Sequence, residues 1–503
     1  MRQKRHKKKR SRRLQNIFWL LALFLFTGYT HQASAEELTL ERALEIAFKN
    51  SPSIQEAQYN LDISRHNLEA ERAGLKSQFN LTLTPYRYSN VKVFNELASQ
   101  YNIQELTKSE ARFSVIQPIL WTGGEVRLTN IFGWQEASSS FTGSVKESQF
   151  NNSLFLQLSQ PLFTYNQRKM QLTELELSLE NAQLNYAIQK LQIERQVTQQ
   201  FLNLFFSWRS LEIAEQQLKN SRESYEIIES KVEAGISAPE ELYQADLTLA
   251  NSQSSLQNQK TQYDNAKDSF KILLGLPLEE ELIIVADIRK SLVDVDLSKA
   301  LDFGLTHRME LKQNDIAIQN ALNDLIVAGA VNEFKAEVSA TLGLTGTDPA
   351  FGQIYEAPNV DQVVQVSVNI PLFDWGRKKH ILAASQAQVD SQRLSASEEI
   401  KNIKLEIREA FRILQNQKTQ IEIAEKNVIN AQRTYEINLE RYKGGDLSAY
   451  DMQLFQLQLT QEQLDEVQAL INYKLALLDL KIRTLWDFEN NISVIDIKAG
   501  DSK

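Results

Sequence analysis

The chain has 503 residues, of which 42% are hydrophobic and 24% charged, a composition typical of a folded protein. Nine of its 55 Lys and Arg residues lie within residues 1–13, so the remainder holds 46 bases against 64 acids, and this acidic excess excludes nucleic acid as a partner. The absence of Cys excludes disulfides, thiolate metal sites and a thiol nucleophile.

Residues 1–35 have the order of a secretory signal peptide. The basic stretch Arg2–Arg13 precedes the apolar run Ile17–Phe26, and the small residues 33–35, Ala-Ser-Ala, follow. Ten apolar residues are short for a membrane anchor, which needs about 20. We therefore expect export, cleavage after Ala35 and a mature chain that begins at Glu36.

The two halves of the remaining sequence resemble each other. The tripeptide Pro-Leu-Phe occurs at 161–163 and again at 371–373, and Gly235 recurs as Gly445, both at an offset of 210 residues. Such a match in register predicts an internal duplication. We expect a first repeat at 36–294, a second at 295–488, and a carboxy-terminal tail at 489–503.

Each repeat shows the same order of predicted elements. A helix begins near Leu40 or Leu297, an extended region follows, and a long helical hairpin with a Gly turn ends the repeat. The hairpins, at about 164–275 and 376–485, carry narrow apolar stripes of the coiled-coil kind. Their longer arms of roughly 65–70 residues predict helices on the order of 100 Å.

The extended regions, at about 77–161 and 335–371, read as β-strands. In Ala336–Leu344 and Val364–Ile370 apolar residues alternate strictly with polar ones, which predicts strands buried on one face. Such strands suit a soluble sandwich or a membrane barrel with a wet lumen, and the export signal favours the barrel. Several aromatic residues near the strand ends predict either an interfacial belt or core packing, and we favour core packing for Phe163 and Phe373.

No motif predicts catalysis or a cofactor. The five His residues are scattered, and no HExxH, GxSxG or GxxxxGK sequence occurs. The adjacent acids Glu240 and Glu241 are more simply explained as helix-start residues than as an acid–base pair. We expect neither enzymatic activity nor a metal or other cofactor.

The order and spacing of these elements resemble the TolC-type outer-membrane efflux and secretion channels over nearly all of residues 38–486. No single motif is specific to that family. The resemblance rests on Leu40-x-x-Ala43-Leu44 with Asn50-Ser51-Pro52, on Gln160–Phe163, on Ile370–Gly376, and on Arg441–Ser448 leading to Asp451.

The resemblance implies an α+β membrane protein that acts as a homotrimer in the cell outer membrane with a long periplasmic extension. Three protomers share one transmembrane β-barrel and one periplasmic α-barrel of long helices. A periplasmic adaptor, or membrane fusion protein, and an inner-membrane pump serve as partners in tripartite efflux or type I secretion. The alternative is a periplasmic coiled-coil scaffold or adhesion protein, which has no need of alternating strands at matched places in both repeats.

The resemblance also assigns candidate site residues. It places Asp451, Glu241 and Tyr442 at a gated periplasmic entrance, although Leu447 and Leu454 stand where the family has an Arg and a second acid. The remaining candidates are the helix-turn tips for adaptor docking, Gly235, Ile236, Ser237, Gly445, Leu447 and Ser448, and the barrel-to-helix junction, Pro161, Phe163, Pro371 and Phe373.

The first repeat has 47 extra residues before its Pro-Leu-Phe tripeptide. They include two alternating stretches, Phe113–Leu120 and Val126–Trp134, around a tight turn at 121–124. We expect four strands from the first repeat and two from the second, so that a trimer closes about 18 strands instead of the 12 of four-stranded protomers. The alternative is an elongated extracellular hairpin outside the barrel wall.

Overall fold

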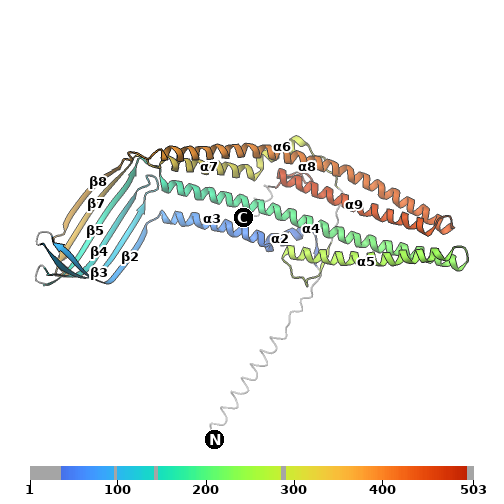
Figure 1. Cartoon of the computed structure of the whole chain (residues 1–503), viewed down its shortest axis with the longest axis horizontal. Coiled ribbons are helices and arrows are strands. Elements are labelled where there is room, and N and C mark those ends of the chain that lie inside the picture. Colours follow the sequence, from blue (N-terminus) through green and yellow to red (C-terminus); the bar gives the residue numbers. More distant parts are fainter. Residues whose placement is uncertain (1–35, 96–98, 141–144, 285–290, 495–503) are drawn as a thin grey trace, which may run out of the picture. The chain divides into compact units, whose positions relative to one another are not determined.

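The computed structural model describes residues 36–95, 99–140, 145–284 and 291–494, so the expected signal peptide lies outside the described residues. Its elements are long helices and one large antiparallel sheet (Figure 1). The described chain divides into two compact units. Among the described residues, the first unit holds 36–51, 197–284 and 427–468, and the second holds 52–95, 99–140, 145–196, 291–426 and 469–494.

Each repeat opens with a short helix that stops and restarts. In the first repeat α2 (Leu40–Asn50) precedes α3 (Pro52–Gly74), and in the second α6 (Leu297–His307) precedes α7 (Met309–Gly329). The side chains of Thr39 and Asp296 accept the hydrogen bonds that start α2 and α6. The restart after each short helix was not predicted from the sequence.

The four long helices form two hairpins. In the first hairpin α4 (Gln167–Glu233) turns into α5 (Pro239–Leu274), and in the second α8 (Arg377–Gly444) turns into α9 (Ala449–Thr484). With 67 and 68 residues, α4 and α8 each correspond to about 100 Å of helical rise. The apolar stripe expected in α8 is buried, and in the second unit it packs on α9 through Ile403, Ile407, Ala410, Leu414, Tyr473 and Leu480.

The sheet has six strands in the order β2-β3-β4-β5-β7-β8, and every neighbouring pair is antiparallel (Figure 1). The strands are β2 (Gln78–Asn95), β3 (Gln100–Pro118), β4 (Glu125–Ser139), β5 (Lys146–Leu162), β7 (Lys335–Asp348) and β8 (Asn359–Asn369). The first repeat therefore supplies four strands and the second two, as predicted. The extra residues of the first repeat belong to the sheet, because β3 and β4 lie between β2 and β5.

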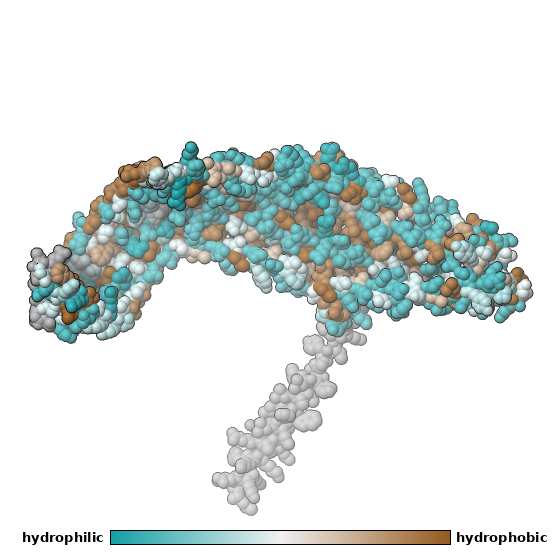
Figure 2. All heavy atoms as spheres, viewed as in Figure 1, coloured by the Kyte–Doolittle hydropathy of each residue, from teal (hydrophilic) through white to brown (hydrophobic). Residues whose placement is uncertain are grey.

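The two faces of the sheet differ in chemistry. Residues that pair across neighbouring strands share a face. One such row is Phe79, Val115, Leu128, Leu156 and Leu342, and the adjacent row on the opposite face is Asn80, Ser114, Thr129, Phe155 and Gly343. In Figure 2, apolar side chains follow β8, whose residues Val360, Val364, Val366 and Val368 are exposed.

Short elements complete the described chain. β1 (Glu36–Leu38) pairs in parallel with β6 (Leu282–Ile284), and β9 (Trp486–Asp487) pairs with β10 (Ile492–Ser493). The short helix η2 (Phe351–Tyr355) links β7 to β8. The expected tail begins with folded residues, because Val494 is buried against Leu191 and Leu485. Within the described ranges, no helix combines the length and apolar character that a membrane crossing requires.

Candidate functional site

The candidate site in the first unit starts with the two hairpin turns. The first helix of each hairpin, α4 or α8, is followed by a glycine with positive φ, +69° at Gly235 and +90° at Gly445. The following amides bond back to the last turn of the helix, Ile236 N–H to the Lys231 carbonyl and Asp446 N–H to the Arg441 carbonyl. Only glycine adopts this left-handed conformation without steric cost, so both turns depend on it.

Tyr442 joins the two hairpins near these turns. Its side chain is 1% exposed, and its hydroxyl donates a hydrogen bond of 3.1 Å to the carbonyl oxygen of Ser224 on α4. The Lys231 ammonium lies 5.0 Å from the centre of the Tyr442 ring and donates to the Tyr442 carbonyl. Burial, together with the nearby Glu241 carboxylate, raises the pKa of Tyr442 to about 12. Tyr442 is therefore a neutral hydrogen-bond donor at any physiological pH.

A buried polar seam continues the same contact between the hairpins. The Gln456 amide donates to the carbonyl oxygen of Gln217 and to Ser221 Oγ, both at 2.9 Å, and the hydroxyls of Ser221 and Ser252 lie 2.8 Å apart. These three side chains, Gln456, Ser221 and Ser252, are at most 3% exposed. Buried hydrogen bonds fix one arrangement of their helices, because any other would leave the polar groups unsatisfied.

Asp451 begins α9 as part of a helix cap. Its carboxylate accepts a hydrogen bond of 2.7 Å from the Ser448 hydroxyl, and its own N–H donates to Ser448 Oγ at 3.1 Å. This exchange is a variant of the capping box. Asp451 and its counterpart Glu241 on α5 are both half-buried. The geometry accounts for Asp451 as a helix-start acid and leaves part of its carboxylate in contact with solvent.

The expected docking residues differ in exposure. Ile236 is 73% exposed at the first turn, whereas Ser237, Leu447 and Ser448 are half-buried. Leu447 packs against the cluster that contains Tyr442, Met452 and Ile228. The sequence did not identify the tip residues Tyr243 and Tyr450, which are 74% and 59% exposed, or the partners Ser224, Lys231 and Gln456.

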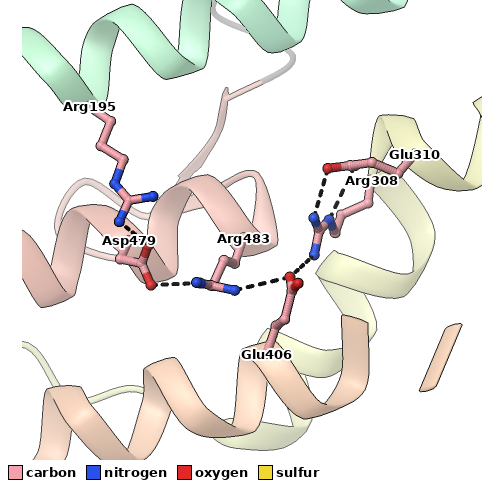
Figure 3. A network of polar contacts seen from close by, with 6 residues as sticks. All are labelled: Arg195, Arg308, Glu310, Glu406, Asp479 and Arg483. Atoms are coloured by element: carbon pink, nitrogen blue, oxygen red, sulfur yellow. Dashed lines mark hydrogen bonds and ion pairs between the residues drawn. The ribbon is translucent and has the colours of Figure 1, made fainter. Parts of the chain in front are cut away.

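The second unit holds a chain of six alternating charges at the break between α6 and α7 (Figure 3). Glu406 on α8 accepts from Arg308 at 2.6 Å and pairs with Arg483 at 3.0 Å. Arg308 also pairs with Glu310, and Asp479 bridges Arg483 and Arg195. The six side chains line a cavity of about 210 Å³.

The ion pairs of this charge chain act as a structural clamp, a set of contacts that holds neighbouring helices together. Burial lowers the pKa of Arg308, but the carboxylates of Glu310 and Glu406 raise it more, and the net shift is upward. Burial likewise raises the pKa of Glu310, and the bond from Arg308 reverses the shift. Both ends of the pair therefore remain charged. The clamp ties the α6–α7 break to α8 and α9, and no sequence motif predicted it.

At the junction of the sheet and the helices, the prediction that Phe163 and Phe373 pack in a core is wrong for a single chain. Phe163 and Phe373 are 66% and 72% exposed, and their rings contact Phe334 and Trp375 respectively. Phe163 and Trp375 have φ angles of +58° and +55°, a costly conformation for bulky side chains. Pro161 lies in β5, and Pro371 follows the end of β8. The junction thus presents aromatic rings at its surface.

No group of three or more His, Cys, Asp or Glu side chains that could hold a metal ion occurs in the described part of the chain. In the first unit, hydrogen bonds between the two hairpins hold the helices together near their turns.

Comparison with known proteins agrees with this fold. The family profile "Outer membrane efflux protein" matches residues 125–276 and 305–482. The cation efflux system protein CusC of Escherichia coli K12 is 23% identical over 287 residues, which are 56% of this chain and 59% of CusC. The chain thus matches somewhat more than half the length of this curated relative.

Solved structures show the same fold over most of the chain. The CmeC outer membrane channel of Campylobacter jejuni has a TM-score of 0.66 at 14% identity and covers 92% of this chain, with 89% of its own chain covered. The outer membrane protein VceC of Vibrio cholerae has a TM-score of 0.65 at 16% identity, and the match covers 88% of this chain and 95% of the VceC chain. The chain belongs to the outer membrane efflux protein family, the TolC-type channels.

Proposed function

We propose that three copies of this chain form a passive, gated conduit across the outer membrane. The observation that carries this proposal is the sheet, which has one apolar face, one polar face and two unpaired edges. In the described chain β2 and β8 each have a neighbour on one side only. Lipid does not tolerate an open sheet edge, so β2 of one copy pairs with β8 of the next until the sheet closes.

The dimensions of the apolar face suit a bilayer. On β5 it extends from Leu162 to Leu154, a rise of roughly 26 Å along the strand. A strand tilt of about 40° reduces this to a band roughly 20 Å tall, somewhat less than the roughly 25 Å typical of outer-membrane barrels. Exposed Phe163, Phe373 and Trp375 then lie at the boundary where aromatic rings gather.

The hairpin tips form the entrance in this proposal. Tyr442 and the polar seam hold the two hairpins of a protomer together, and Asp451 and Glu241 of three copies gather around the pore axis. The tip residues 235–237 and 445–448 dock the periplasmic adaptor, which connects the channel to an inner-membrane pump. The signal peptide at 1–35 and the repeats at 36–294 and 295–488 complete the proposed organisation.

The conduit serves efflux in the first instance, because the family profile is that of efflux proteins. The name of CusC refers to cations, and a cation is therefore a reasonable first cargo to test. Type I secretion uses the same kind of passage and is the second candidate.

Reconstitution tests the proposal directly. The protein is purified from outer membranes, its mass in detergent is measured, and it is inserted into planar bilayers. We expect a trimer, and discrete ion-conducting events at a low open probability. A water-soluble, non-conducting protein would support the coiled-coil scaffold instead. Cells that lack the protein should accumulate the cargo, and complementation should reverse the accumulation.

A further inference from the structure

The strand pair β3–β4 is a full member of the sheet. Residues 104–118 of β3 pair with residues 125–139 of β4 without interruption. On the other sides β3 pairs with β2 from Gln78↔Ile116 to Asn95↔Gln100, and β4 pairs with β5 from Glu125↔Ser159 to Ser138↔Lys146. A protruding hairpin would lack such neighbours on both sides.

Side-chain hydrogen bonds also join the turn that links the end of β3 to the start of β4, here called the inner turn, to the adjoining elements. Gln117 of β3 donates to the carbonyl oxygen of Leu75 just after α3, and Gln160 of β5 donates to the carbonyl oxygen of Thr122 in the turn. Each Gln also donates to the carbonyl oxygen of the Pro that follows it, at 2.8 and 2.9 Å. The same Gln-Pro contact therefore occurs at the ends of β3 and β5.

The start of α4 holds the other side of the turn. The Asn166 amide donates to the carbonyl oxygen of Leu120, and Arg168 pairs with Glu125 at 3.0 Å. The turn is thus bonded to segments on both sides of it, which fixes the position of β3–β4 between β2 and β5.

The apolar and polar faces of β3 and β4 coincide with the apolar and polar faces of the other strands in the sheet. Val115 and Leu128 lie in the apolar row with Leu342, whereas Ser114 and Thr129 lie in the polar row. Five charged side chains of the pair lie on the polar face, Lys108, Glu110, Arg112, Glu125 and Arg127, whereas Glu105 and Glu136, at the ends of the strands far from the connecting turn, lie on the opposite face. In the part of the pair nearer this turn, the apolar face can therefore meet lipid and the charged face can meet water.

We propose that β3–β4 is part of the membrane wall, and that three copies close an 18-stranded barrel with a charged, water-filled lumen. This inference rests on the proposed trimeric channel. Barrel diameter grows roughly linearly with strand number, and barrels of 16–18 strands enclose an aqueous channel. Relative to 12 strands the lumen is about 1.5 times as wide. The outer barrel therefore admits bulky cargo, and selection by size belongs to the periplasmic entrance.

Cysteine labelling tests the wall, because the chain has no native Cys. Leu128→Cys and Thr129→Cys are neighbours on opposite faces of β4, and Leu342→Cys and Thr341→Cys are the matched controls on β7. In liposomes a water-soluble maleimide should label Thr129→Cys as it does Thr341→Cys, and both leucine positions should be at least tenfold slower. Equal labelling of the two β4 positions would overturn the inference.

A deletion of the strand pair β3–β4 tests the width of the proposed barrel. Removal of residues 100–139 joins β2 to β5 through the outer loops and leaves four strands per copy. The largest polyethylene glycol that lowers conductance from the extracellular side should then have a hydrodynamic radius about one third smaller. An unchanged cut-off in a conducting variant contradicts the 18-stranded barrel, and if the variant does not fold the labelling decides.

The two proposals fail differently. A wild-type protein that neither trimerises nor conducts would overturn the proposed function. A conducting trimer with both faces of β4 labelled would overturn only the wide barrel.

Discussion

The Tyr442 hydroxyl donates to the carbonyl oxygen of Ser224, a residue 218 positions earlier in the chain, so that α8 of the second repeat is bonded to α4 of the first. The contact lies beside the two glycine turns and is completely buried on the tyrosine side. Tyr442→Phe removes this one hydrogen bond and keeps the ring, which makes Tyr442 the first place to test the proposed entrance.

Tyr442→Phe should loosen the tips without unfolding them. Loss of one buried hydrogen bond costs about 1 kcal/mol, which raises an opening equilibrium about fivefold. Single-channel recording should show this rise in open probability, and amides near residues 224 and 442 should exchange faster. Tyr435→Phe is the matched control, since Tyr435 is a buried tyrosine of the same cluster. An equal effect of both substitutions would argue against a special role of the Ser224 contact.

Tyr442 should also make the stability of the folded protein depend on pH in the alkaline range. The pKa of Tyr442 in the folded protein is about 12, above the ordinary value of about 10. Its contribution to stability is complete below pH 10 and is lost as the pH rises through 12, because the unfolded state ionises first. The stability difference between wild type and Tyr442→Phe should be constant from pH 7 to 10 and then shrink. A difference that stays constant up to pH 12 would refute this.

Asp451 can be tested for a pore role separately from its capping role. Asp451→Asn removes the charge and keeps an acceptor for the Ser448 hydroxyl, whereas Ser448→Ala removes the cap and keeps the charge. Three carboxylates near one axis favour a bound cation. We expect block by multivalent cations to be lost in Asp451→Asn and retained in Ser448→Ala. Block that persists in Asp451→Asn would make Glu241 the next candidate.

The charge chain of the second unit should matter for stability. Glu406→Gln leaves Arg308 and Arg483 without their shared carboxylate, and Arg308 is only 11% exposed. We expect the free energy of local unfolding of α6 and α7 to fall by roughly 1–3 kcal/mol, measured by hydrogen exchange. Asp390→Asn, which breaks an exposed pair with Arg393 at 3.9 Å, should cost at most about 0.5 kcal/mol. Similar losses of free energy in Glu406→Gln and Asp390→Asn would mean that the charge chain does not clamp these helices.

Export is tested by the mature amino terminus. Protein taken from outer membranes should begin at Glu36, because the sequence Ala-Ser-Ala at 33–35 follows an apolar run. Amino-terminal sequencing gives the answer. An intact segment 1–35, or protein found only in the cytosol, would contradict export.

The sequence predicted those features of the fold that depend on local chemistry. The helix starts predicted near Leu40 and Leu297 are confirmed, and in the structure the side chains of Thr39 and Asp296 cap them. Hairpin turns follow from Gly235 and Gly445, and strands follow from strict alternation. The fold class and the family were correct for the same reason, since the order of these local signals is itself distinctive.

The features that depend on distant partners were not predicted. Nothing in the sequence near Tyr442 indicates Ser224, and nothing near Glu406 indicates Arg308, because each pair meets only after the helices pack. The exposure of Phe163 was misjudged because an apolar residue in a single chain can face lipid or a second copy as well as a core.

The inner turn between β3 and β4 has a consequence for how such channels can change during evolution. The chain enters the sheet from α3 through β2 and leaves it through β5 to α4. In the proposed channel, strands can therefore be inserted between β2 and β5 only in pairs, because an odd number would place the start of α4 on the other side of the membrane. The Gln-Pro contact at the ends of both β3 and β5 is what a copied hairpin would leave behind. In the proposed channel, a two-strand insertion can thus widen the barrel while every long helix keeps its direction.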